Sequence, residues 1–130
     1  MKKVLLCLCV LTILGLQASD DIGANMKGMR DGLVEIQDGF LYNQKDSILS
    51  GIKKIEKLND ELHSKKTVLA LLPKDKKRFL NIALISAKSL ASNLQEMREY
   101  IEQNHYTEAS STNAIIIRNC TRCHSVVRGW

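Results

Sequence analysis

The chain has few of the residues on which nucleic-acid-binding and disulfide-rich proteins depend. Its 130 residues include 5% aromatic residues, one proline and four cysteines. So few aromatic side chains leave little surface on which bases can stack, and a formal net charge of +5 is low for a nucleic-acid-binding domain. The one proline, Pro73, leaves long stretches in which no residue interrupts a helix. We therefore expect a helical protein that does not bind nucleic acid.

Long uncharged apolar runs are also scarce, and the one that stands out lies at the N-terminus. Residues 1–18 read MKKVLLCLCVLTILGLQA, in which Lys2 and Lys3 precede an apolar run that Ala18 closes. This order is typical of a secretory signal peptide, and the run is shorter than the roughly 20 apolar residues that span a bilayer. We predict that residues 1–18 are a signal peptide and that residues 19–130 form one periplasmic domain without a membrane span.

Apolar residues in the rest of the chain recur three and four positions apart, which is the period of an amphipathic helix. Four such runs follow one another: Ile22, Met26, Met29, Leu33, Ile36 and Phe40; Ile48, Ile52, Ile55, Leu58 and Leu62; Phe79, Ile82, Ala83, Leu90, Leu94, Met97 and Ile101; and Ala109, Ile116, Ile117, Cys120, Cys123 and Val127. Asn43, just before the second run, belongs to a residue type that caps helix starts. The pattern predicts an all-α fold, arranged as an antiparallel four-helix bundle.

The cysteines outside the signal peptide lie together near the C-terminus, in the segment NCTRCHSVVRGW. Cys120, Cys123 and His124 make a Cys-x-x-Cys-His motif, which is typical of covalent haem attachment. The two thiols form thioethers with the haem vinyl groups, and the adjacent imidazole ligates the iron. At about 100° per residue on a helix, the three residues share one face of the last run. Bacterial haem attachment of this type follows secretion, which agrees with the signal peptide.

Two other kinds of site use closely spaced cysteines. A thioredoxin-like redox pair requires a βαβ setting and a helix start, whereas this pair lies late in a helix. A tetrahedral zinc site requires further ligands, and His63 and His105 have no ligand spacing relative to the cysteines. Covalent haem attachment is therefore the preferred interpretation, with one haem c and its iron as the cofactor.

With these features the chain resembles cytochrome c-prime and its low-spin, methionine-ligated relatives, which are four-helix-bundle c-type cytochromes. The resemblance rests on CTRCHSVVR near the end of the chain and NMKGM near its start. It implies a haem site near the C-terminal end of the last helix, with His124 as the proximal iron ligand. Members of the family commonly carry a basic residue four positions after the histidine that ligates the iron, and Arg128 occupies that position. The resemblance also implies that Met26, which is followed by Lys27, is the distal ligand.

The sequence departs from the family pattern at one position. Members often carry an arginine about one turn before the methionine, where it meets a haem propionate, but this chain has Ile22 there. Lys27 and Arg30 are the candidates for the haem periphery instead. A methionine on an apolar helix face is often only part of the core, so three alternatives stay open. Met26 binds the iron, Met29 binds it from one turn away, or neither sulfur binds.

The distal ligand separates two functions. With His124 and Met26 on the iron, the metal has no open position, and the protein is a one-electron carrier between redox proteins of the periplasm or the inner membrane, not an enzyme. With five-coordinate iron, the protein binds nitric oxide or carbon monoxide, as cytochrome c-prime does. We predict the carrier, with the first helix facing the last across a gap lined by Leu33, Ile116 and Val127. Family relatives are often dimers, so a homodimer is a further expectation.

A basic cluster follows Pro73 and consists of Lys74, Lys76, Lys77 and Arg78. Positive charge at a helix start opposes the helix macrodipole. A solvated helix start is the ordinary interpretation of this cluster, and a docking patch for an acidic partner is the alternative.

Overall fold

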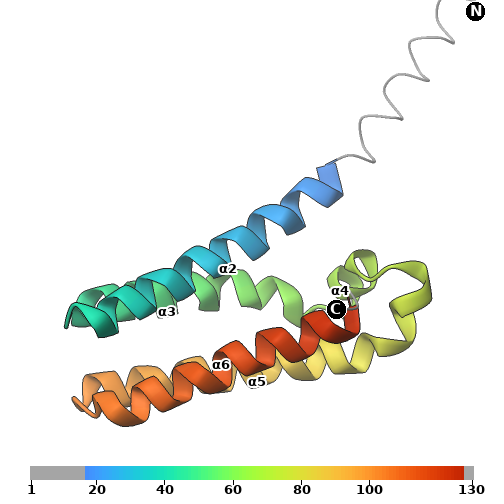
Figure 1. The fold of residues 1–130 in the computed structure, drawn as a ribbon. Helices are drawn as coiled ribbons and strands as arrows, with labels where there is room; N and C mark the ends of the chain where they lie inside the picture. The colour runs from blue at the N-terminus through green and yellow to red at the C-terminus, as the bar shows by residue number, and fades with distance from the viewer. Residues whose placement is uncertain (1–16, 128–130) are drawn as a thin grey trace, which may run out of the picture.

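The computed structural model describes residues 17–127, and nearly all of them lie in helices (Figure 1). The elements are α2 (Gln17–Leu41), α3 (Lys45–Asp60), the 3₁₀ helix η1 (Glu61–His63), α4 (Lys65–Leu71), the 3₁₀ helix η2 (Lys74–Phe79), α5 (Leu80–Glu102) and α6 (Tyr106–Val127). No strand occurs between residues 17 and 127, which confirms the all-α prediction for this part of the chain. None of the helices in this range is long and apolar enough to cross a membrane. Most of the predicted signal peptide, residues 1–16, and Arg128 lie outside the described residues.

The long helices form two pairs. α2 lies along α3, and α5 lies along α6 (Figure 1). The chain turns back after α2 and again after α5, so that helices adjacent in the sequence pack side by side. Packing between α3 and α5 joins the two pairs.

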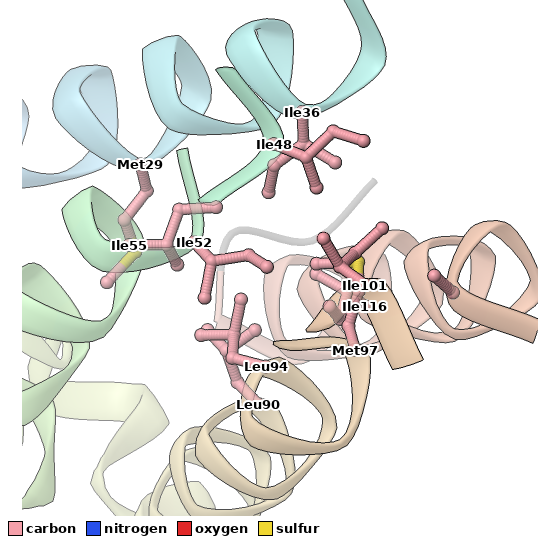
Figure 2. Packing of buried hydrophobic residues seen from close by; sticks show 11 residues of the cluster. Met29, Ile36, Ile48, Ile52, Ile55, Leu90, Leu94, Met97, Ile101 and Ile116 are labelled. Atoms are coloured by element: carbon pink, nitrogen blue, oxygen red, sulfur yellow. The ribbon is translucent and has the colours of Figure 1, made fainter. Parts of the chain in front are cut away.

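The apolar faces that the spacing predicted meet between the two pairs of helices. The buried residues of this core are Met29, Ile36, Ile48, Ile52, Ile55, Leu90, Leu94, Met97, Ile101, Ala109 and Ile116 (Figure 2). Each large aliphatic side chain that is removed from water contributes about 1.5–3 kcal/mol. The core is therefore the main source of stability, and it fixes the positions of α2 and α6 on which the candidate site depends.

Asn43 ends the first helix rather than beginning the second, so its predicted role as a cap of the second helix is wrong. Its φ angle is 56°, in the left-handed region that asparagine tolerates better than most residues. The backbone N–H of Gln44 donates to the Gly39 carbonyl at 2.8 Å, which closes the end of α2. Asn104 occupies the same place after α5, with a φ angle of 61°. Both sharp turns between paired helices therefore depend on an asparagine.

Glycines bring α2 and α3 into close contact. A Cβ atom on Gly51 of α3 would lie 2.5 Å from the carbonyl oxygen of Gly32 on α2, and 2.7 Å from Cγ1 of Ile36. The carbonyl belongs to the backbone, so it cannot move aside without displacing the helix. The close approach of the two helices therefore requires a residue without a side chain at position 51.

We expect Gly51→Ala to lower the free energy of unfolding by about 1–3 kcal/mol, because the added methyl group overpacks against the backbone of α2. Gly23→Ala in α2 is the matched control, since a Cβ atom there meets nothing within 4 Å. Helix propensity alone predicts that the control gains up to about 1 kcal/mol. Urea denaturation followed by circular dichroism measures both variants, and equal gains in stability would contradict the close approach.

The connection between the two helix pairs packs against the ends of α5 and α6. Val68 and Leu72 are buried together with Ala83 of α5. Cys123 and Val127 of α6 pack against the same small cluster. The connection therefore forms a wall at the end of the molecule where the Cys-x-x-Cys-His motif lies.

Candidate functional site

The Cys-x-x-Cys-His motif lies near the C-terminal end of α6, where it faces a cavity of about 330 Å³. Cys120, Cys123 and His124 all line this cavity, and all three are half-buried. Because α6 is helical through Val127, residues three and four positions apart share a face. The volume lies within the roughly 300–1,000 Å³ of pockets that enclose small molecules.

Two methionines of α2 line the same cavity, Met26 and Met29. Met26 is half-buried, whereas Met29 is only 7% exposed. Figure 2 shows the Met29 side chain extending toward Ile55 within the core. Met29 therefore fills core space as well as bordering the cavity, and Met26 is the less confined of the two thioethers.

Residues of the first and last helices line one cavity, and its lining differs from that of the predicted gap at one position. Leu33 of α2 and Val127 of α6 line the cavity. Ile116 does not border it but is fully buried in the core, so its assignment to the gap is wrong.

Two asparagines in the cavity wall were not singled out from the sequence. Asn59 of α3 is 1% exposed, and its side-chain Nδ2 donates to the backbone carbonyl of Ala87 at 2.9 Å. Its Oδ1 atom has no hydrogen-bond partner. Asn119 of α6 donates from Nδ2 to the Ser89 hydroxyl at 3.0 Å. These bonds tie α5 to α3 and to α6 around the cavity, a role that helical periodicity alone does not reveal.

The basic residues predicted at the haem periphery fall into different places. Arg30 lines the cavity, its side chain is 70% exposed, and it forms an ion pair with Asp31 at 2.7 Å. Lys27 is exposed and is not part of the described cavity lining. Arg128 lies outside the described residues. Of the three, Arg30 is therefore the cation whose contact with the cavity is established.

The two histidines considered as further metal ligands lie away from the thiols. His63 Nε2 is 3.4 Å from Asn59 Nδ2, and His63 is not among the residues described as lining the cavity. His105 packs against Tyr100, with ring centroids 6.3 Å apart, before the start of α6. At about 1.5 Å per residue, that end of α6 is roughly 20 Å from Cys120. Among residues 17–127 no three His, Cys, Asp or Glu side chains form a group that could hold a metal ion.

Burial raises the pKa of both cysteine thiols above the ordinary value. For Cys120 the largest cause is burial, and the neighbouring Cys123 raises its pKa further. For Cys123 burial is the cause. Catalytic redox cysteines have a lowered pKa because the thiolate is the nucleophile. This pair therefore lacks the electrostatic setting of a thioredoxin-like site.

We expect both thiols of the haem-free chain to react slowly with iodoacetamide at about pH 8, where an unperturbed thiol is already partly ionised. The raised pKa values shift the alkylation profile to higher pH in the folded chain than in urea. The folded chain holds the thiol protons more tightly than the unfolded chain does. The free energy of unfolding therefore falls as the pH rises from the thiol pKa of the unfolded chain through the higher thiol pKa of the folded chain. Mass spectrometry of the alkylated chain measures the rates, and identical pH profiles with and without urea would contradict the burial of the thiols.

No protein-family model matches the chain, and neither a curated protein nor a solved structure shows significant similarity to it.

Proposed function

We propose that this protein is a periplasmic c-type cytochrome that carries single electrons on one covalently bound haem. The proposal rests mainly on one observation: Cys120, Cys123 and His124 of α6 line the same cavity as Met26 of α2. Two thiols, an imidazole and a thioether are the donors that hold a c-type haem with histidine and methionine on its iron. Residues almost a hundred positions apart in sequence thus supply one coherent donor set.

The remaining cavity residues also suit a haem. Apolar side chains come from several helices, among them Leu33 of α2, Val68 of α4 and Leu90 of α5. An apolar shell of this kind excludes water from the ring and its iron. Arg30 borders the cavity with most of its side chain in solvent. A guanidinium at the rim of a pocket suits a carboxylate such as a haem propionate. Arg30 would thus take the role of the family arginine that is absent at position 22.

Each donor has a distinct role in this proposal. Cys120 and Cys123 hold the haem covalently, and His124 supplies the proximal nitrogen. Met26 supplies the distal sulfur, because it borders the cavity and its side chain is less committed to the core than that of Met29. When bound, the haem supplies a reversible one-electron couple, and a methionine ligand raises its potential. The chain itself orients the two ligands and leaves no position for a substrate.

The pairing of the helices supports an antiparallel four-helix bundle as the scaffold. α2 with α3 and α5 with α6 are each joined by a sharp turn, and α3 packs on α5. Bundles of this kind place ligand sites between facing helices. The cavity between α2 and α6 is such a place.

The cellular setting of the proposal follows from the sequence. The predicted signal peptide places the carrier in the periplasm, where it would exchange electrons with other redox proteins there or at the inner membrane. A homodimer is also proposed, since Val34 and Leu41 on α2 are exposed apolar residues that a second copy would cover. Sedimentation of the purified protein tests that state.

Exposure of the reduced protein to carbon monoxide tests the proposed function. If Met26 and His124 both bind the iron, carbon monoxide changes the visible spectrum slowly or not at all. A rapid spectral change would replace the carrier with a gas-binding protein that has five-coordinate iron. Absence of any haem spectrum from protein exported by a strain that attaches haem would overturn both functions.

A further inference from the structure

Six basic residues lie on the connection between α3 and α5. We refer to them as the basic connection surface: Lys65, Lys66, Lys74, Lys76, Lys77 and Arg78. Within residues 17–127, none of them forms an ion pair with a carboxylate. Lys76 and Arg78 lie over the ring of Phe79, at 5.8 Å and 4.7 Å from its centroid. Residues 65–79 carry all six of them and one carboxylate, Asp75, so basic residues outnumber acidic ones there by six to one.

The basic connection surface belongs to the same segment that walls the cavity. Val68 and Leu72, between its two groups of lysines, line the cavity beside Cys123. η2, which carries four of the basic residues, contacts both α5 and α6. A partner that covers this surface would therefore lie against the segment that walls the proposed haem site.

Basic residues elsewhere in the described chain are more dispersed. Exposed residues without a carboxylate ion pair are Lys27, Lys53, Lys57, Lys88, Arg118 and Arg122, and no four of them lie within five consecutive positions as those of η2 do. Glu96, Glu99 and Glu102 are exposed on the last two turns of α5, at its other end. Acidic residues just before the connection already have partners: Glu61 accepts a hydrogen bond from Asn25, and an oxygen of Asp60 lies 3.9 Å from His63. The connection beside the cavity therefore carries the densest group of unpaired basic residues, whereas exposed acidic residues gather at the other end of α5.

We infer that the basic connection surface docks an acidic patch on the redox protein with which this chain exchanges electrons. The inference rests on the proposed function, because it assigns the partner of that same site. A complementary charge of this kind orients a partner during diffusion and accelerates encounter. It places the acidic protein against the wall formed by α4 and η2.

The apolar residues of the segment argue against a lipid surface as the occupant. A helix that binds a membrane surface presents large apolar side chains together with its basic ones. Here Val68 and Leu72 are turned into the cavity wall. Among the residues whose side-chain exposure the structure describes, the exposed large apolar ones are Val34, Leu41, Tyr42, Ile85, Tyr106 and Ile117, all outside the connection. An acidic protein surface needs no such insertion.

Binding of a fluorescein-labelled peptide of ten glutamates to the full haem-loaded protein tests the inference, measured by fluorescence anisotropy at about 0.1 M salt. The double variant Lys74→Glu/Lys77→Glu should weaken binding by about tenfold or more, as expected when steering charges are reversed. The matched control is Lys53→Glu/Lys88→Glu, which changes two exposed lysines of α3 and α5 and alters the net charge equally. Its effect should stay within about threefold, because exposed charges beyond the roughly 10 Å Debye length are screened.

Oxidation of the reduced protein by hexacyanoferrate(III) provides a second readout. Each anion accepts one electron and becomes hexacyanoferrate(II), so the stoichiometry is one to one. The connection variant should slow this reaction more than the control does, and added salt should abolish the difference. With tris(phenanthroline)cobalt(III), a cationic oxidant, the connection variant should be oxidised faster than the control variant.

Each outcome decides for or against the basic connection surface. Selective loss of peptide binding in the connection variant supports it. Equal losses of peptide binding in both double variants would mean that net charge alone explains the effect, and this result would overturn the proposed docking role of the surface. Binding to vesicles that contain phosphatidylserine, without binding to the peptide, would assign the surface to a membrane instead. A normal six-coordinate haem spectrum with no selective loss would overturn this inference while leaving the proposed function standing.

Discussion

Replacement of both Cys120 and Cys123 by alanine is expected to abolish covalent haem attachment. Each thiol supplies one thioether, and both line the cavity on the same face of α6. Either single substitution should lower the yield of covalent haem severely, because one of the two attachment points is lost. Haem staining on a denaturing gel, together with the intact mass of the protein, measures the result.

Thr121→Ala is the matched control for the cysteine variants. Thr121 lies between the two cysteines but is exposed, and its hydroxyl donates to the Ile117 carbonyl of its own helix. This variant should keep full haem staining. Normal staining of the double cysteine variant would show that the haem, if present, is attached elsewhere, and the proposed site would be lost.

Replacement of Met26 by leucine is expected to convert a low-spin iron into a high-spin one. Leucine has about the volume of methionine, so the fold should lose less than about 1.5 kcal/mol. It has no sulfur, however, and the distal position of the iron opens. The reduced variant should bind carbon monoxide rapidly where the unmodified protein does not, as measured by absorption spectroscopy.

Met29→Leu provides the comparison, since Met29 borders the same cavity one turn away. Its spectrum should stay low-spin, because this side chain extends toward Ile55 and fills the core (Figure 2). Met26→His should also remain low-spin, because imidazole is itself an iron ligand. If Met29→Leu opens the iron and Met26→Leu does not, the distal role passes to Met29.

Much of the fold was predictable because helical periodicity reports directly on buried faces. Ile36, Ile52, Leu94 and Ile101 were each assigned to an apolar face, and all are fully buried. The motif was predictable for a similar reason, since three residues spaced for one helix face must share it once the helix forms.

Features that depend on the approach of two helices were less predictable. Gly51 gave no signal, because the need for a missing side chain arises only when α2 and α3 come together. Asn59 was overlooked, since its amide crosses to a carbonyl of α5 that no local pattern identifies. Ile116 has the spacing of a cavity residue, but it is buried in the core with residues of the other long helices, which its own helix does not determine. Asn43 was assigned to the wrong helix because asparagine suits both helix starts and left-handed helix ends.

The coordination of the iron tests the central claim most directly, and resonance Raman spectroscopy of the purified protein reports it in both oxidation states. The claim is that Cys120, Cys123, His124 and Met26 hold one haem for electron transfer. It predicts a c-type haem spectrum with six-coordinate, low-spin iron in the oxidised and the reduced protein alike. A five-coordinate, high-spin spectrum, or a protein without haem after export in a strain that attaches it, would contradict the claim.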